Sequence, residues 1–169
     1  VRNVFRDLLP IPLDGANIFG MDAIDRNILS ILQEDGRATM TDVASRVGLS
    51  LSACHRRFRD LEAGGVVRGY RADLDLDLLG VPFEALVFVT LNAGDRAAVV
   101  AFEEAVAEVP GIVQAHRLFG DPDYQIYVAT ASKQHFQVLY DETLLQLPGV
   151  QRLRSTLIMK TVVEHRAPL

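Results

Sequence analysis

The residues best suited to recognising a charged partner lie in one short stretch of the chain. Residues 46–71 contain six arginines and two acidic residues, a local net charge of +4, although the whole chain carries −5. Arginine forms paired hydrogen bonds with guanine, and serine and histidine can reach base edges or phosphates. A basic segment within an acidic chain therefore predicts that this stretch binds nucleic acid.

A second group of polar side chains lies in the turn sequence Gly120-Asp121-Pro122-Asp123. Two carboxylates this close together can form a catalytic pair or a metal site, but no histidine cluster lies nearby in the sequence. The simplest alternative is a tight turn in which Asp121 and Asp123 bond the neighbouring backbone. The residues alone leave these alternatives open and favour the turn.

Other site chemistries find little support. Cys54 is the single cysteine, which excludes an intramolecular disulfide framework and a cysteine-based zinc cluster. We expect it to be a small core residue, with a redox sensor as the less favoured alternative. The four histidines lack His-x-x-x-His spacing, and no phosphate-binding, nucleophile-elbow or dinucleotide motif occurs. Nothing in the sequence therefore requires an enzyme or a cofactor.

The composition predicts a folded, soluble, cytoplasmic protein of one large or two small domains. Apolar residues make up 49% and charged residues 23% of the 169 residues, the balance of an ordinary globular chain. No apolar run approaches the roughly 20 residues that span a bilayer. Residues 1–20, rich in proline and glycine, are expected to be a weakly ordered extension ahead of a natural start at Met21. The alternative is an arm that contacts DNA or a neighbouring subunit.

Residues 21–65 are predicted to form three short helices. Asp22 begins the first, whose apolar residues recur with helical spacing and which ends near Asp35. The second begins with the capping pattern Thr39-Met40-Thr41-Asp42 and ends at Gly48. A short step to Ser50 starts the third, which ends at Gly64-Gly65. Two helices joined by a glycine turn predict a helix-turn-helix, whose second helix enters a major groove.

Helical spacing divides the third helix into two faces. Cys54, Phe58 and Leu61 form the buried face, and Ser52, Arg56 and Arg59 point away from it, with His55 beside them. The plain alternative is a solvated charged face, but the turn and the local charge favour DNA binding. The predicted DNA-contacting residues are Ser50, Ser52, His55, Arg56, Arg57, Arg59, Arg68 and Arg71.

Residues 66–82 are predicted to be a linker. Its first part, 66–71, can be a short strand, a wing beside the DNA or part of a dimer contact, and Arg68 and Arg71 are candidate backbone clamps. The acidic residues that follow lead to Gly80 and Pro82, a credible domain boundary.

Residues 83–165 are predicted to form a second domain that alternates strand and helix. Strands are expected at 83–91, 112–119, 124–131 and 150–163, and helices at 95–109 and 132–147. This βαββαβ order is the ferredoxin-like unit, so the fold class is α+β. Helices on one face leave the other open. Leu86, Phe88, Leu157 and Met159 are candidates for its apolar part, which predicts a homo-oligomer.

Several segments, in the right order and spacing over about residues 21–163, resemble the Lrp/AsnC family of bacterial and archaeal transcription regulators. These segments are Met21–Leu29, Gly36-Arg37, Val47–Ser50, Arg57–Glu62, Gly69-Tyr70, Gly120–Tyr124 and Leu147–Val150. The resemblance implies an N-terminal winged helix-turn-helix, a βαββαβ ligand-sensing domain, and dimers that assemble into tetramers or octamers. It also implies that the effector is an amino acid.

The resemblance also implies where the effector binds. The family's pocket lies between sensing domains of neighbouring dimers, and the matching residues here are Leu118, Gly120, Asp121, Asp123, Tyr124, Thr156, Leu157 and Ile158. Asp121 can accept hydrogen bonds from the ammonium group of an amino acid, and amides exposed by Gly120 can donate to its carboxylate. Pro122 departs from the larger hydrophobic residues usual after the first aspartate and stiffens the turn.

Three classes of function follow, in order of preference. The first is a DNA-binding transcription regulator whose DNA affinity or oligomeric state responds to a small molecule. The second is a ligand-independent architectural protein of the same fold that organises DNA. The third is a metabolic enzyme that uses the helix-turn-helix for assembly.

Overall fold

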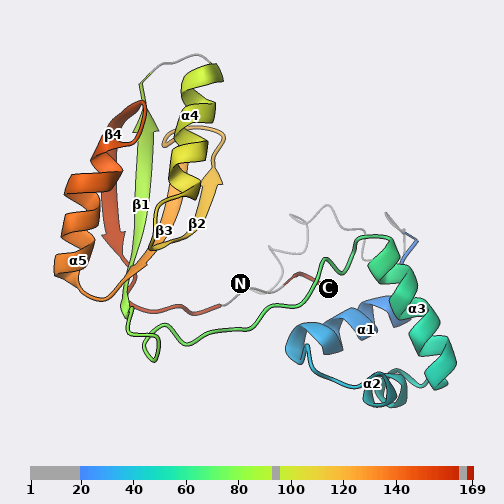
Figure 1. The fold of residues 1–169 in the computed structure, drawn as a ribbon. Coiled ribbons are helices and arrows are strands. Elements are labelled where there is room, and N and C mark those ends of the chain that lie inside the picture. The colour runs from blue at the N-terminus through green and yellow to red at the C-terminus, as the bar shows by residue number, and fades with distance from the viewer. Residues whose placement is uncertain (1–19, 93–95, 164–166) are drawn as a thin grey trace, which may run out of the picture. The chain divides into compact units, whose positions relative to one another are not determined.

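The computed structural model describes residues 20–92, 96–163 and 167–169. Nearly all of the predicted N-terminal extension, and Asp95, lie outside the described residues. The chain divides into two compact units. Of the described residues, one unit holds 20–72, Val163 and 167–169, and the other holds 73–92 and 96–162 (Figure 1).

The first unit contains three helices, α1 (Ala23–Glu34), α2 (Met40–Val47) and α3 (Leu51–Ala63). The predicted caps Asp22, Thr39 and Ser50 each accept a hydrogen bond from the backbone amide three residues later. These bonds satisfy amides that have no partner within the helix. Gly48 ends α2 in the left-handed conformation, with φ of 70°, which glycine adopts without steric cost. Local sequence therefore fixes where each helix starts.

The three helices enclose one small apolar core. Ile28 of α1, Val43 of α2 and Cys54 of α3 are fully buried, and Leu61 is nearly so. Phe58 packs against this cluster and is half-buried. The predicted inward face of α3 is thus its packed face.

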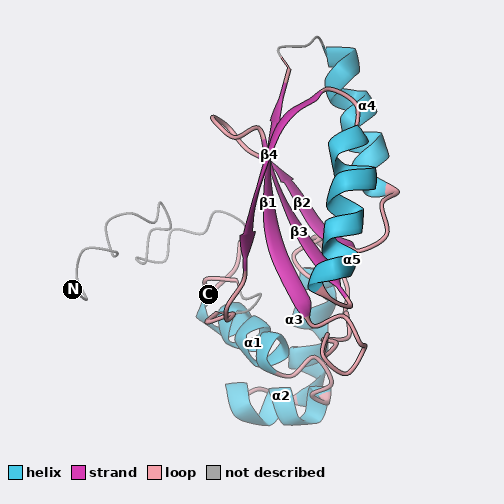
Figure 2. Ribbon diagram, turned by 90° about the vertical axis from the view of Figure 1, so that its left-hand side faces the viewer, coloured by secondary structure: helices cyan, strands magenta, loops and turns pink. Residues whose placement is uncertain are grey.

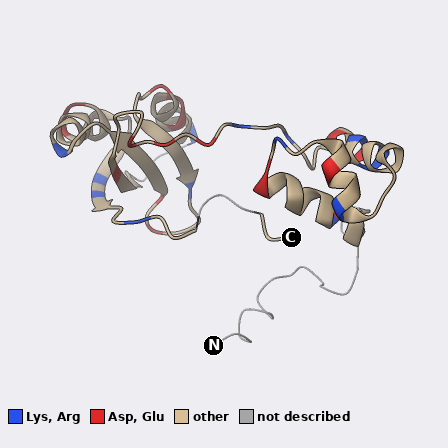
Figure 3. Cartoon of the chain, turned by 90° about the horizontal axis from the view of Figure 1, so that it is seen from below, with Lys and Arg blue, Asp and Glu red and all other residues tan. Residues whose placement is uncertain are grey.

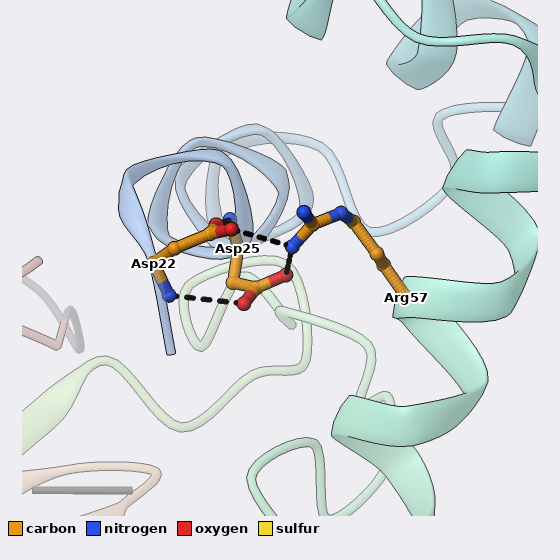
Figure 4. Close-up of polar contacts among 3 residues, drawn as sticks. All are labelled: Asp22, Asp25 and Arg57. Atoms are coloured by element: carbon orange, nitrogen blue, oxygen red, sulfur yellow. Dashed lines mark hydrogen bonds and ion pairs between the residues drawn. The ribbon is translucent and has the colours of Figure 1, made fainter. Parts of the chain in front are cut away.

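An ion-paired cluster joins the start of α1 to the middle of α3 (Figure 4). The guanidinium of Arg57 lies 2.8 Å from the carboxylate of Asp22 and 2.9 Å from that of Asp25. The two aspartates also cap α1 reciprocally, since each carboxylate accepts the other's backbone amide at 3.0 Å. The Asp25 amide is the main cause that lowers the pKa of Asp22, and Arg57 adds to it. The cluster fixes the rotation of α3 relative to α1.

The segment 66–82, which includes the boundary of the two units at Ala72/Asp73, contains no strand. Residues 66–82 form turns, bends and irregular backbone, and of the three alternatives for 66–71 the short strand is not observed. Figure 3 shows the change of charge along this segment, from basic residues beside the helical unit to acidic residues. Arg68 and Arg71 are both exposed.

The second unit is an antiparallel sheet with helices on one face (Figure 2). Its strands, in the spatial order β2-β3-β1-β4, are β1 (Phe83–Leu91), β2 (Ile112–Arg117), β3 (Tyr124–Thr130) and β4 (Val150–Leu157). Helix α4 (Arg96–Ala107) and helix α5 (Lys133–Val138) cover the face that carries Val87 and Val128, both fully buried. The predicted ferredoxin-like α+β fold is confirmed.

Two predicted elements differ most from the expectation, while β2, expected to reach 119, ends at Arg117, and α4, expected to reach 109, ends at Ala107. The segment 132–147 is not one α-helix, because α5 passes into a π-helical turn (Leu139–Thr143) and a 3₁₀ turn (Leu144–Gln146). The last strand, predicted to reach 163, ends at Leu157. Its neighbour β1 begins at Phe83, and the amide of Ile158 makes one further bond to the Glu84 carbonyl. Pro82 has no amide hydrogen to extend the pairing.

The open face of the sheet carries both apolar and basic groups. Leu86 and Phe88 lie opposite Thr156 and Arg154 of β4 on this face, and the Arg154 guanidinium lies 5.1 Å from the centre of the Phe88 ring. Leu157 is not on it, because its partner Ala85 is buried on the helix-covered face. The face is therefore more polar than expected.

We predict that Asp25→Ala lowers the free energy of unfolding of the helical unit by about 2 kcal/mol, because it removes hydrogen bonds to a charged group and leaves Arg57 without its more buried partner. Denaturant unfolding followed by circular dichroism measures this. Asp42→Ala is the matched control, since Asp42 holds the same position in α2 but its carboxylate accepts the Thr39 hydroxyl instead of an arginine. Equal losses in the two variants would show that the cluster adds nothing beyond capping.

Candidate nucleic-acid interface and acidic hairpin

The outward face of α3 presents a continuous polar surface. Ser52, His55, Arg56 and Arg59 are all exposed, and together with Asp60 they line a shallow hollow along the helix. Because Cys54 and Leu61 are buried on the opposite side, these groups cannot turn inward without unpacking the core. The helix therefore offers two arginines to a polyanion at fixed positions.

Ser50 and Ser52 lie at the start of this face. The Ser50 hydroxyl accepts a hydrogen bond from the Ala53 amide at 3.3 Å and lies 3.3 Å from the Ser52 hydroxyl. Ser50 therefore orders the first turn of α3, while Ser52 keeps hydrogen-bonding capacity for a partner.

Arg57 does not share the outward face with Ser52, His55, Arg56 and Arg59 of the predicted DNA-contacting set. Its side chain is 29% exposed and is held by Asp22 and Asp25. The spacing could have indicated this, since Arg57 follows Cys54 by three positions and precedes Leu61 by four, and both are inward-facing residues. Arg57 positions the recognition helix.

The hairpin between β2 and β3 is closed by Asp123. The Asp123 amide donates to the Val89 carbonyl at 2.9 Å, and its carboxylate accepts the Leu91 amide at 2.7 Å. The Leu118 amide donates to the Asp123 carbonyl at 2.7 Å. The interpretation of Asp123 as a turn residue thus fits its contacts.

Asp121 differs from Asp123 in its surroundings. Its carboxylate is 75% exposed and lies 3.6 Å from the guanidinium of Arg152, with the Thr90 hydroxyl at 3.4 Å. These are long contacts to flexible side chains. Gly120 beside it has a φ of 135° and open space around its Cα. The Asp121 end of the hairpin is accessible to a ligand.

Tyr124 faces away from the hairpin surface. Its hydroxyl donates to the Glu103 carboxylate at 2.6 Å, and its ring centre lies 4.6 Å from that of Phe102. Burial, followed by the hydrogen bond to Glu103, raises the pKa of Tyr124 to about 12. Alternation along β3 could have predicted this orientation, because Ile126 and Val128 are buried on the same side. Tyr124 is part of the core under α4.

The other predicted effector residues lie at the far end of the sheet. Thr156 pairs with Leu86 and Leu157 with Ala85, whereas Asp123 binds the amide of Leu91. Leu86 and Leu91 are five residues apart on the extended strand β1, which corresponds to a distance of about 17 Å. One chain therefore does not bring the two halves of the predicted site together.

Metal-ligating clusters and membrane-spanning helices are both absent from the residues that the structure describes. No group of three or more His, Cys, Asp and Glu side chains among residues 20–92, 96–163 and 167–169 could hold a metal ion. Within the same ranges, no helix has the length and apolar character needed to cross a membrane. Burial raises the pKa of the Cys54 thiol, which disfavours the reactive thiolate form.

Each of the two units matches a known protein family. Residues 21–68 match the winged helix-turn-helix DNA-binding family, and residues 84–168 match the Lrp/AsnC ligand binding domain. The leucine-responsive regulatory proteins of Escherichia coli K12 and Klebsiella pneumoniae are both 38% identical to the chain over 142 residues, which are 84% of this chain and 87% of each relative.

Solved structures agree with this assignment. A transcriptional regulator from Neisseria meningitidis, in complex with L-Met, aligns with a TM-score of 0.81 at 31% identity over 85% of this chain and 93% of that one. An AsnC family regulator from Agrobacterium tumefaciens aligns with a TM-score of 0.80 at 30% identity, over 88% and 96%.

These relatives are regulators, which confirms the preferred class of function over the enzyme. The basic outward face of α3, in a helix-turn-helix joined to a βαββαβ unit, is what such a regulator requires. The chain belongs to the Lrp/AsnC family of DNA-binding transcription regulators with a ligand-binding domain.

Proposed function

We propose that the protein is a cytoplasmic transcription regulator that reads duplex DNA through the outward face of α3 and responds to an amino acid bound at the Asp121 hairpin. The observation that carries the proposal is the division of the arginines on α3. Arg57 is held by two carboxylates within the helical unit, whereas Arg56 and Arg59 are exposed on its outer side.

DNA contact follows from this geometry. In a helix-turn-helix dimer, two recognition helices enter successive major grooves about one helical turn apart. Arg56 and Arg59 contact phosphates or guanine edges, and Ser52 and His55 supply shorter hydrogen bonds. Arg68 and Arg71, exposed on the segment that follows the helices, add contacts to the DNA backbone.

The effector class follows from the groups at the hairpin. A free amino acid carries an ammonium and a carboxylate, so its site must supply an acceptor and donors. The exposed carboxylate of Asp121 accepts from the ammonium, and the backbone amides around Gly120 donate to the carboxylate. The L-Met bound to the Neisseria meningitidis relative supports an amino acid as the class of ligand.

The site is completed by another copy of the chain. Thr156, Leu157 and Ile158 lie at the end of the sheet opposite the hairpin, so they can join Asp121 around one ligand only when two sensing units meet. Leu118 and Leu157, 37% and 54% exposed, then provide the apolar wall. Ligand binding in such a site changes how the sensing units pack against each other. Because each sensing unit is joined to a DNA-binding unit, this packing also changes the spacing of the DNA-binding units.

Removing the two outward arginines tests DNA recognition. If Arg56 and Arg59 of each protomer neutralise four phosphates per dimer, they contribute about −3.6 to the log–log slope of affinity against salt. We predict that the double variant Arg56→Ala/Arg59→Ala makes this slope less negative by about that amount and weakens binding of a selected duplex by at least a hundredfold at low salt. Fluorescence anisotropy titrations at several salt concentrations measure both quantities.

The matched control removes two positive charges from the sensing unit, in the variant Arg96→Ala/Lys133→Ala. Both side chains are exposed, and we expect the wild-type slope. If the two double variants lose affinity equally, net charge and not the face of α3 determines binding.

Titration with L-methionine and the other free amino acids tests the effector proposal. Allosteric coupling of about 1–3 kcal/mol corresponds to a change in DNA affinity of roughly 5- to 150-fold. We predict such a change for at least one amino acid with the wild-type protein, and a change below twofold for Asp121→Asn, because the amide removes the charge that binds the ammonium. Asp141→Asn, another exposed aspartate of the same unit, should respond as the wild type does. A wild-type protein indifferent to all twenty amino acids would instead support a ligand-independent architectural role.

A further inference from the structure

Leu51 is exposed at a place where the fold provides nothing to pack against it. It is the first residue of α3 and is 46% exposed. Leu49, two residues earlier, packs against the core of the helical unit, and Leu61 is buried in it, but Leu51 is not part of that core. Isolated exposed leucines are common on protein surfaces, so this exposure has meaning only through its position.

That position is the leading turn of the recognition helix. Leu51 precedes Ser52 directly and lies one turn before His55, so it borders the exposed face that also carries Arg56 and Arg59. Side chains of a helix tilt toward its N-terminus, so Leu51 projects ahead of the first turn. In a helix-turn-helix the N-terminal residues of the recognition helix contact base edges.

The surroundings of Leu51 are otherwise polar and ordered. The hydroxyls of Ser50 and Ser52 lie 3.3 Å apart, and Ser50 also accepts the Ala53 amide. These bonds hold the backbone on both sides of Leu51 in place. Of the described residues of α3, Leu51 is the single large apolar side chain that is exposed. A partner that binds at this turn therefore contacts one apolar side chain, that of Leu51, among hydrogen-bonding groups.

We propose that Leu51 determines sequence specificity by contacting the C5 methyl group of a thymine in the major groove. The major-groove edges of the four bases present hydrogen-bonding groups, and the thymine methyl is the one apolar group among them. Leucine cannot hydrogen-bond to a base or a phosphate, so this methyl is the complementary feature for it. The inference rests on the proposed reading of DNA by α3, and it adds a residue absent from the predicted contact set.

Replacing thymine by uracil removes only that methyl group, which makes the test specific. A duplex selected from a random pool by the full-length wild-type protein is resynthesised with each thymine changed singly to deoxyuridine, and affinities are measured. We expect that each half-site contains one thymine whose replacement weakens wild-type binding about fourfold. This is the effect expected when one methyl group is no longer buried at the interface. For Leu51→Ala, the thymine and uracil duplexes should bind equally.

Two further variants separate this role from general effects. Leu51→Met keeps an apolar side chain and should retain the discrimination. Leu78→Ala truncates another leucine, 87% exposed and outside α3, and should match the wild type. Alanine favours helix more than leucine, so equal thermal midpoints should show that Leu51→Ala is folded.

A wild-type protein indifferent to every uracil substitution, or a Leu51→Ala variant that still discriminates, overturns the inference alone. Failure of the proposed function has a different signature, namely that Arg56→Ala/Arg59→Ala binds the selected duplex as tightly as the wild type does.

Discussion

The orientation of α3 depends on the ion pairs between Arg57 and the carboxylates of Asp22 and Asp25. A helix of thirteen residues with a narrow apolar stripe can rotate about its own axis against the neighbouring helices. The bonds from Arg57 to Asp22 and Asp25, together with the buried Cys54 and Leu61, oppose that rotation. Because Asp22 and Asp25 also cap α1, the start of one helix and the orientation of another depend on the same three side chains. The outward direction of Arg56 and Arg59 is a consequence.

The sensing unit separates its polar groups in a way that suits regulation. The hairpin around Asp121 and the end of β4 lie at opposite ends of the sheet, so a ligand that contacts both must bridge two chains. In the proposed function, binding energy is converted into a change of assembly, because the ligand stabilises only those arrangements that bring the two ends together. Asp123 and Tyr124 have a different part in this, since their bonds to Leu91 and Glu103 keep the hairpin in place on its own sheet.

Local features of the structure could be predicted from the sequence, and contacts between distant segments could not. The caps Asp22, Thr39 and Ser50 act within three residues, so their types and spacing were sufficient, and the limits of β1 followed from its run of apolar residues. The partners of Arg57 lie more than thirty positions away, and no local pattern identifies them. The end of β4 depends on where β1 begins, which is also a contact between distant segments. The face of Tyr124, in contrast, is local, since it follows from the alternation along β3 with the buried Ile126 and Val128.

The most direct measurement of this account is the NMR spectrum of the arginine side chains, recorded on the full-length protein with and without its selected duplex. The Nη1–H signals of Arg57, the group that donates to Asp25 and also lies against Asp22, should be protected from solvent exchange already in the free protein and should keep their chemical shifts when DNA is added. The signals of Arg56 and Arg59 should exchange rapidly in the free protein and become protected on binding. A spectrum in which DNA shifts Arg57 and leaves Arg56 and Arg59 unchanged would contradict the assignment of the outward face.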